Sequence, residues 1–309
     1  MDVRWTTATL LVCLGLLLTP VPPAQGVVVA PSGALDHPLS TGDGGRTMLV
    51  EEVTATWCPS CAEIDPELVR VADSHGSRIA LIALHPSDGE DDFQPPASQH
   101  RIDRINDLRD SPVLSTPTFV VEGGEARVGY EAWTDVQRDI LATELQRDGM
   151  STLSFTVTPG DGVFRVNVND LDLIRTSDTQ LTFMVLEHDK KVSPSSDNPG
   201  GPTRDRVLVG LAECAVDNAT VITSLGLAHA DVAQDCATDF SIEFNETAHW
   251  SVVLIHEHLN NNGSAASSMS LGVVELGYRP ISTPVNDDVS VWVLITCGTI
   301  GLVALRRKM

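Results

Sequence analysis

Residues 47–75, TMLVEEVTATWCPSCAEIDPELVRVADSH, decide the fold that this sequence predicts. Residues 47–56 read as a strand, and 62–75 carry apolar side chains at helical spacing. A short apolar run at 78–84 follows, and we interpret it as a second, buried strand. A strand, a helix and a strand within about 40 residues predict a βαβ unit with a parallel sheet.

Patterns further along the chain divide it into two halves. The first half continues with an acidic loop at 85–98, a short helix at 102–108, a strand at 118–121, a hairpin turn at 122–125, its partner at 126–129 and a helix at 134–145. From 151 onward the sequence alternates apolar and polar residues, with strands expected at 153–157, 163–168, 181–185, 206–211, 241–244, 250–256 and 268–276. Such short alternating strands predict an all-β sandwich.

The motif Cys58-Pro59-Ser60-Cys61 lies where the first strand gives way to the helix. The unpaired N–H groups of a helix N-terminus stabilise a thiolate, so Cys58 is expected to be a nucleophile. Cys61 lies one turn on and can attack a mixed disulfide at Cys58. A structural zinc site and a purely structural disulfide are the alternatives, but zinc needs four ligands and a structural disulfide does not need this junction.

At these residues the sequence resembles the thioredoxin superfamily, over 47–146, which is about a third of the chain. The features that carry the resemblance are Trp57-Cys58-x-x-Cys61, Pro66, Glu52, Thr116-Pro117-Thr118 and Gly129. They are similar to the active sites of protein disulfide isomerases and of periplasmic thiol–disulfide oxidoreductases. The implied fold class is an α/β thioredoxin-like domain followed by an all-β sandwich domain and a C-terminal transmembrane helix.

The resemblance also implies roles for single residues. Cys58 attacks, Cys61 resolves, and a buried Glu52 relays the proton of Cys61. A cis Pro117 leaves the backbone of Thr116 free to pair with an extended substrate. Trp57 either shapes the surface that receives the substrate or only covers the core.

Alternatives remain open at several of these positions. Glu52 can be a solvated strand carboxylate, since Glu51 beside it points to the other face, and Pro117 can be an ordinary trans turn proline. His85, which ends the second strand, can tune the site or have no role in it. Pro59-Ser60 departs from the dipeptides of both reducing and isomerising family members, so the reduction potential is left open.

Two apolar segments at the ends predict targeting. Residues 1–26 read as a signal peptide, and 289–305 as a transmembrane helix followed by a cytoplasmic tail at 306–309, although a buried core helix is the alternative for the second run. Between them we expect an extended leader at 27–45, the thioredoxin-like domain at 46–149, the β-sandwich domain at 150–280 and a stalk at 281–288. This arrangement predicts a single-pass type I protein of the cell membrane whose domains are extracytoplasmic.

Charge and the remaining cysteines narrow the functional classes. A net charge of −22 argues against nucleic acid and anionic lipid surfaces as partners. In an oxidising compartment Cys214 and Cys236 are expected to form a structural disulfide, whereas Cys13 and Cys297 lie in the apolar end segments. Asn218, Asn245 and Asn262 begin possible glycosylation sequons.

Histidines in the second half give a weaker signal. His256 and His258 would project to one strand face near His249, but no cysteine or carboxylate cluster supports a metal site there. We therefore expect no metal and no cofactor. The predicted function is a membrane-anchored thiol–disulfide oxidoreductase for extracytoplasmic protein thiols and disulfides, with an unidentified redox partner. Alternatives are a non-catalytic surface binding module and a copper-handling thiol protein.

Overall fold

The computed structural model describes residues 26–108, 113, 115–147, 149–169, 171–259 and 269–281. Up to residue 147 its elements are β1 (Val27–Val29), β2 (Leu39–Ser40), β3 (Met48–Val53), α2 (Pro59–Ser74), η1 (Gly76–Arg78), β4 (Ile79–Leu84), α3 (Pro96–Asp107), β5 (Thr118–Val121), β6 (Ala126–Val128), η2 (Tyr130–Ala132) and α4 (Trp133–Gln146). The later elements are β7 (Phe155–Pro159), β8 (Val163–Val168), β9 (Thr179–Glu187), β10 (Lys190–Lys191), β11 (Thr203–Arg204), β12 (Val207–Ala215), η3 (Val216–Asn218), β13 (Thr220–Leu225), β14 (His229–Asp231), α5 (Cys236–Asp239), β15 (Ser241–Asn245), β16 (Trp250–His258) and β17 (Gly272–Tyr278).

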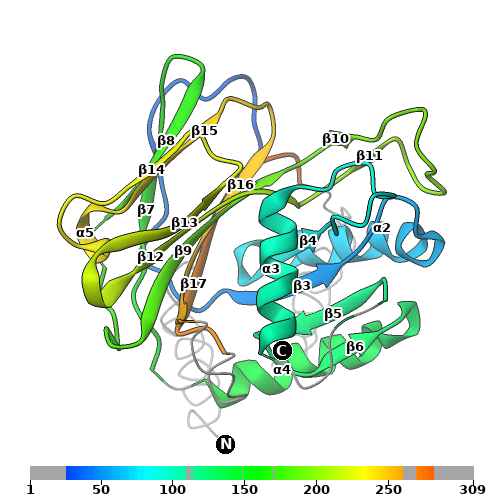
Figure 1. Cartoon of the computed structure of the whole chain (residues 1–309), viewed down its shortest axis with the longest axis horizontal. Helices are drawn as coiled ribbons and strands as arrows, with labels where there is room; N and C mark the ends of the chain where they lie inside the picture. Colours follow the sequence, from blue (N-terminus) through cyan, green and yellow to red (C-terminus); the bar gives the residue numbers. More distant parts are fainter. Residues whose placement is uncertain are drawn as a thin grey trace, which may run out of the picture.

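Most of the described strands belong to one mixed sheet of ten strands. Its order is β1-β17-β16-β9-β12-β4-β3-β5-β6, and β13 pairs with β12 beside this path. A second sheet of five strands has the order β14-β15-β8-β7-β2, and β10 and β11 form a separate two-stranded arm. In Figure 1 the arm projects from the β-rich half over the end of β4 and α2.

This topology corrects the predicted fold class. We expected an α/β thioredoxin-like domain followed by an all-β sandwich domain and a C-terminal transmembrane helix, and the described residues instead form a mostly β structure with few helices. The strands of the two halves share one sheet, because Val207 of β12 pairs in parallel with Ala83 of β4 and the Ala83 amide donates to the Arg206 carbonyl at 2.9 Å. The prediction failed because periodicity identifies strands but does not identify their partners.

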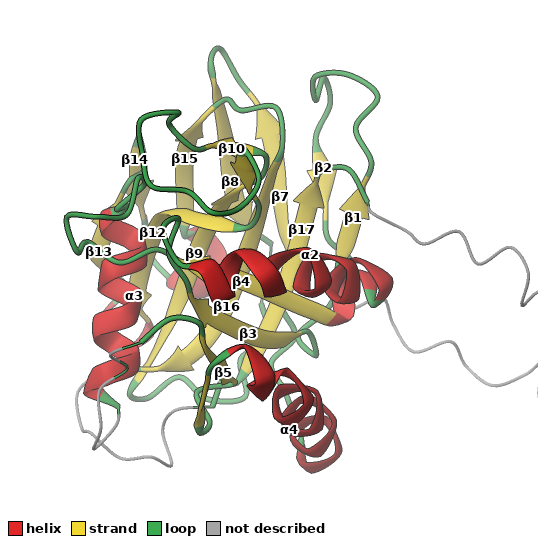
Figure 2. Ribbon diagram, turned by 90° about the vertical axis from the view of Figure 1, so that its right-hand side faces the viewer, coloured by secondary structure: helices red, strands yellow, loops and turns green. Residues whose placement is uncertain are grey.

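The large sheet is covered on both faces. On one face α3 packs across strands of both halves, and the cluster beneath it includes Ile102 of α3, Leu49 of β3 and Met184 of β9. On the opposite face α2 and α4 cover β3, β4 and β5. Leu68 and Ile140 belong to the separate hydrophobic cluster between these helices and strands. Figure 2 shows α2 and α4 below the arm and α3 apart from them. Because side chains alternate along a strand, one sheet supplies both cores.

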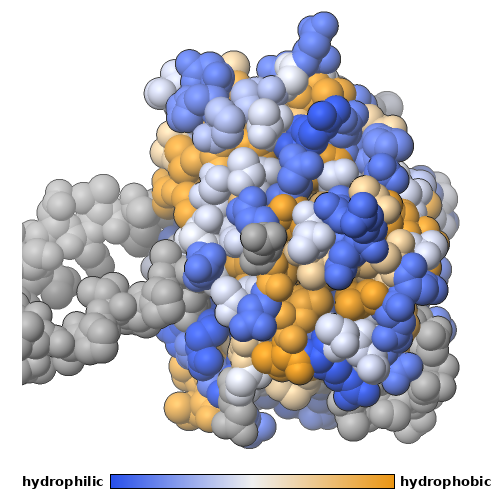
Figure 3. All heavy atoms as spheres, turned by 90° about the vertical axis from the view of Figure 1, so that its left-hand side faces the viewer, coloured by the Kyte–Doolittle hydropathy of each residue, from blue (hydrophilic) through white to orange (hydrophobic). Residues whose placement is uncertain are grey.

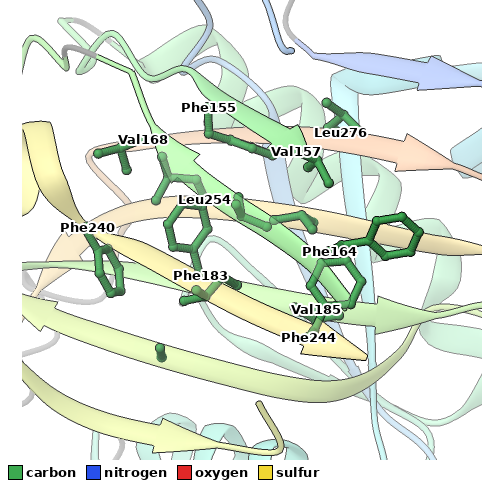
Figure 4. Packing of buried hydrophobic residues seen from close by; sticks show 14 of the residues in the cluster. Phe155, Val157, Phe164, Val168, Phe183, Val185, Phe240, Phe244, Leu254 and Leu276 are labelled. Atoms are coloured by element: carbon green, nitrogen blue, oxygen red, sulfur yellow. The ribbon is translucent and has the colours of Figure 1, made fainter. Parts of the chain in front are cut away.

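Beyond α2 and α4, the same face of the large sheet packs against the five-stranded sheet. The core between them is rich in aromatic rings that meet at centroid distances of 5.0–5.7 Å, among them Phe155, Phe183 and Phe240. Figure 4 shows these rings between the strands of the two sheets, with Val185 and Leu254 beside them. The predicted β-sandwich architecture is therefore present, although one of its sheets continues into the first half.

The segment expected to be an extended leader is part of both sheets. Val27 begins β1, which pairs in parallel with β17, and Leu39 begins β2, which pairs antiparallel with β7. The Tyr278 hydroxyl also donates to the Gly33 carbonyl at 2.7 Å. These contacts anchor the chain ahead of β3.

The outer face of the β-rich end is not uniformly polar. Figure 3 shows hydrophobic side chains scattered among hydrophilic ones on this side of the molecule. On β13, Ile222 is 48% exposed, and the strand alternates exposed and half-buried positions. An exposed strand of this kind carries too weak an apolar pattern to be found from sequence.

Membrane anchoring was predicted for residues outside the described part of the chain. Residues 1–25 of the signal peptide predicted at 1–26, the apolar run at 289–305 and the tail at 306–309 all fall there. Among the residues that the structure describes, no helix has both the length and the apolar character needed to cross a bilayer.

Candidate active site

The Cys58–Cys61 pair lies at the start of α2. Cys58 is the N-cap residue of the helix, and its sulfur accepts a hydrogen bond from the Cys61 amide at 3.1 Å. The two sulfurs are joined in a disulfide, with the Cα atoms 5.3 Å apart. Cys58 is 2% exposed and Cys61 is fully buried. The sulfur of Cys58 therefore lies where the free N–H groups of the helix favour a negative charge.

Trp57 connects the cysteine pair to the acidic loop between β4 and α3. Its indole N–H donates to Asp88 Oδ2 at 3.0 Å, while another carboxylate of the loop, Asp91, accepts from the Thr56 amide at 2.7 Å. Asp91 also contacts the buried His85 ring at 2.8 Å. Burial opposes ionisation of Asp91, but the bonds to His85 and the backbone prevail and lower its pKa. His85 thus takes part in holding the loop against the residues before Cys58.

Both carboxylates of β3 are buried, on opposite faces of the sheet. Glu51 accepts from Arg101 of α3, whereas Glu52 is 3% exposed and its Oε1 has no hydrogen-bond partner among the described residues. Burial and the nearby charge of Asp65 raise the pKa of Glu52 well above its ordinary value, with Arg204 acting against them. The solvated alternative for Glu52 is therefore not what the structure contains.

A cleft of about 310 Å³ runs beneath α2, and we call it the α2 cleft. Its walls come from β3, α2, β4 and the end of the arm, and include Glu52, Thr54, Ala62, Asp65, Pro66, Arg70, His85, Gly201, Arg204 and Arg206. Arg204 Nε lies 3.5 Å from Asp65 Oδ2, and the two side chains are 6% and 23% exposed. The cleft thus joins residues from both halves of the chain.

Thr116 and Pro117 are joined by a cis peptide bond immediately before β5. The next residue, Thr118, pairs with Val53 at the end of β3. This register places Pro117 beside the segment that leads from β3 to Cys58. Thr116 is half-buried there.

The predicted structural disulfide is confirmed. Cys214 of β12 and Cys236 at the start of α5 are bonded, and both are fully buried in the sandwich core. A chain crosslink at this position ties the large sheet to the loop that leads into β15.

The histidines of the second half do not gather at one place. His249 pairs with Asp189 at 2.6 Å, and the buried His256 bonds to the Ser151 hydroxyl at 2.7 Å. Within the described ranges, no group of three or more His, Cys, Asp or Glu side chains is arranged to hold a metal ion.

Comparisons with known proteins add little to this picture. No protein-family model and no curated protein matches the sequence. A crystal structure of an Agrobacterium tumefaciens protein from the Northeast Structural Genomics Consortium is similar at a TM-score of 0.47 and 11% identity, over 76% of this chain and 96% of that one.

Sequence reasoning missed two members of the site, Asp65 and Arg204. Asp65 lies in the exposed-looking stretch of α2 before Pro66, and only its distance of one turn from Cys61 hinted at a role. Arg204 comes from the arm in the other half, and no local pattern connects it with the cysteines.

Proposed function

We propose that this chain is a thiol–disulfide oxidoreductase that acts outside the cytoplasm on the thiols and disulfides of other proteins. The main support is the Cys58–Cys61 disulfide at the N-terminus of α2, with the buried Glu52 in the cleft under the same helix. The resemblance of this motif to thioredoxin-type active sites points the same way. A second, buried disulfide at Cys214–Cys236 fits an oxidising compartment.

The chemistry needs no cofactor. A substrate thiolate attacks Cys58 Sγ, the Sγ–Sγ bond breaks, and Cys61 leaves as a thiolate. Glu52, whose pKa burial raises well above its ordinary value, gives its proton to Cys61. The second substrate thiolate then attacks the substrate sulfur that is bonded to Cys58 in the mixed disulfide. Cys58 leaves as a thiolate.

The electrons balance in this sequence, because the substrate dithiol becomes a disulfide while the Cys58–Cys61 pair becomes a dithiol. In the reverse direction Cys58 attacks a substrate disulfide and Cys61 resolves the mixed disulfide, with Glu52 taking the proton. The reduction potential of the pair, measured in glutathione buffers, decides which direction dominates.

Reduction of insulin by dithiothreitol tests the proposal with the purified full-length protein. We expect the protein to accelerate the reaction and Cys58→Ser to abolish the acceleration. Ser87→Ala, on the exposed part of the acidic loop, is the control and should retain the full rate. Equal rates for the wild type and Cys58→Ser would reject the enzymatic function.

The burial of the disulfide supports a second candidate, a non-catalytic binding module. With Cys58 2% exposed and Cys61 fully buried, the sulfurs present almost no surface to a large partner in this conformation. In that case Cys58 and Cys61 only fix the start of α2. This alternative predicts that the wild type and Cys58→Ser bind a partner equally well and that neither accelerates the reduction of insulin.

A further inference from the structure

We propose that Asp65 and Arg204 complete a proton path that runs through the α2 cleft from Glu52 to solvent, with Asp65 as a positioning residue that passes protons to and from Glu52. The inference rests on the proposed redox function. It assigns to the arm, and so to the β-rich half of the chain, a direct part in the reaction.

The first argument is that the α2 cleft has room for water. Its volume of about 310 Å³ corresponds to about ten water molecules at roughly 30 Å³ each. The buried Glu52 and the exposed Pro66, Arg70 and Gly201 all line this one cleft. Water can therefore reach the carboxyl group of Glu52 from the surface.

The second argument comes from unpaired polar atoms of residues that line this cleft. Glu52 Oε1, Thr54 Oγ1 and His85 Nε2 are buried and have no hydrogen-bond partner among the described residues. Buried polar groups in native proteins are normally satisfied, by ordered water where no protein partner is in reach. Glu52 lies on β3, Thr54 directly follows β3 and His85 directly follows β4, and all three residues line the cleft. Water bound in the cleft is the partner that could satisfy these groups.

The third argument is the charge around Asp65. The titratable and charged residues that line the cleft together with Asp65 are Glu52 from β3, His85 directly after β4, Arg70 from α2, and Arg204, Asp205 and Arg206 from the end of the arm. Burial raises the pKa of Asp65 to about 6, with Arg204 lowering it and Asp205 adding to the rise. Two neighbouring carboxyl groups that both resist ionisation can share one proton near neutral pH.

Arg204 is held in place by four hydrogen bonds. One terminal nitrogen donates to the Gly201 carbonyl at 2.8 Å and the Thr203 carbonyl at 3.1 Å. The other donates to Asn198 Oδ1 at 2.7 Å and the Thr56 carbonyl at 3.3 Å. A guanidinium fixed in this way keeps a cation beside Asp65 and prevents the pKa of the two carboxyl groups from rising further.

In the reaction, Glu52 gives its proton to the Cys61 thiolate as the disulfide opens, and the resulting carboxylate takes a proton from Asp65 through water. Asp65 is reprotonated from solvent at the open end of the cleft. When the disulfide closes again the same protons travel outward. Without Asp65, Glu52 would recover its proton more slowly from a buried position.

The test is single-turnover reduction of the full-length protein by excess dithiothreitol at pH 5 to 9, with acid-quenched free thiols counted by mass spectrometry. Rates are divided by the dithiothreitol thiolate concentration. We expect a titration near pH 6 in the wild type, its loss together with about a tenfold lower rate in Asp65→Asn, and its return in Asp65→Glu. Glu67→Gln, whose side chain lies on the exposed face of α2 and is 47% exposed, is the matched control.

An Asp65→Asn rate and pH profile equal to those of the wild type would overturn the path. Arg204→Lys, which keeps the cation, should retain the profile, whereas Arg204→Met should move the titration to higher pH because a lowering charge is lost. If Arg204→Met fails to fold, the two Asp65 variants still decide the matter. The assay uses a small thiol, so a protein that is inactive on insulin can still show the path, and the two proposals can fail separately.

Discussion

Substitution of Arg101 tests whether the two halves of the chain, which share one large sheet, unfold together. Its guanidinium extends from α3 to Glu51 on β3 and to Glu257 on β16, with Nη1 2.8 Å from Glu257 Oε2. All three side chains are at most 5% exposed. Replacement by Met fills the volume but leaves two buried carboxylates without this partner, which should lower the free energy of unfolding by about 3–5 kcal/mol.

Urea denaturation followed by tryptophan fluorescence and far-ultraviolet circular dichroism measures this loss. Arg138→Met is the control, because Arg138 pairs with Asp135 on the surface of α4, where the side chains are 70% and 47% exposed. Such a pair contributes about 0–0.5 kcal/mol. A loss below about 1 kcal/mol for Arg101→Met would refute the reasoning. Two separate unfolding transitions, only one of which shifts its midpoint in the variant, would refute it as well.

The pH dependence gives the same test a second readout. Burial raises the pKa of Glu257, but Arg101 and Arg104 prevail and hold it at about 2. The ionised carboxylate therefore stabilises the wild type above pH 4.5, and this contribution is lost as the pH falls towards 2. Arg101→Met weakens this contribution. The difference in the free energy of unfolding between the variant and the wild type should therefore become smaller as the pH falls.

Three further outcomes follow from the β-rich half. Burial lowers the pKa of His256 to about 4 from 6.5, so the unfolded chain binds the extra proton first and stability should fall by about 3 kcal/mol as the pH drops through that window; urea titrations of His256→Gln should lack this slope. Replacing Cys214 and Cys236 by Ser, which opens a crosslink with a sequence separation of 22, should cost about 3 kcal/mol in the same assay, and an unchanged midpoint would contradict it. Phe183→Ala, in the aromatic core, should lower stability by about 3–5 kcal/mol, against less than about 0.5 kcal/mol for the exposed Ile222→Ala.

Local elements of the fold were accessible from the sequence. The helix expected at 134–145 spans 133–146, and the strand expected at 118–121 has those bounds. The helix carries apolar residues at helical spacing and the strand is a short apolar run, and both signals depend only on neighbouring residues. The helix expected at 102–108 is α3, which starts earlier, at Pro96. Its first turn lacks an apolar period because it carries Ser98, whose hydroxyl bonds to the Leu208 carbonyl.

Long-range pairing was not accessible. The contact between β4 and β12 is a single parallel register pair, Ala83 with Val207, and neither residue signals the other. The leader strand β1 was missed because Val27 follows small residues that favour a cleavage site. In both cases tertiary contacts decide the structure, and a one-dimensional pattern does not contain them.

The candidate site divides in the same way. Cys58 and Cys61 are found from a motif, because the chemistry requires both at a fixed spacing on one helix. Asp65 and Arg204 are joined only when the arm folds back over α2. Glu52 is intermediate, since alternation along β3 indicates two faces but not which face has a partner, and here the structure places Arg101 on the side of Glu51.

The arm also connects the surroundings of Cys58 and Cys61 to the rest of the molecule. Asp92 of the acidic loop accepts from the Ser193 amide at 2.7 Å and from the Ser196 hydroxyl, and the Lys190 ammonium lies 5.4 Å above the Phe93 ring. The same loop holds Trp57 through Asp88. Since the arm is the connection between β9 and β12, the strands that build the sandwich core also fix the loop next to Cys58. A candidate site assembled in this way requires both halves of the chain to be folded before its cysteines reach their final surroundings, so the β-rich half is a structural component of the site.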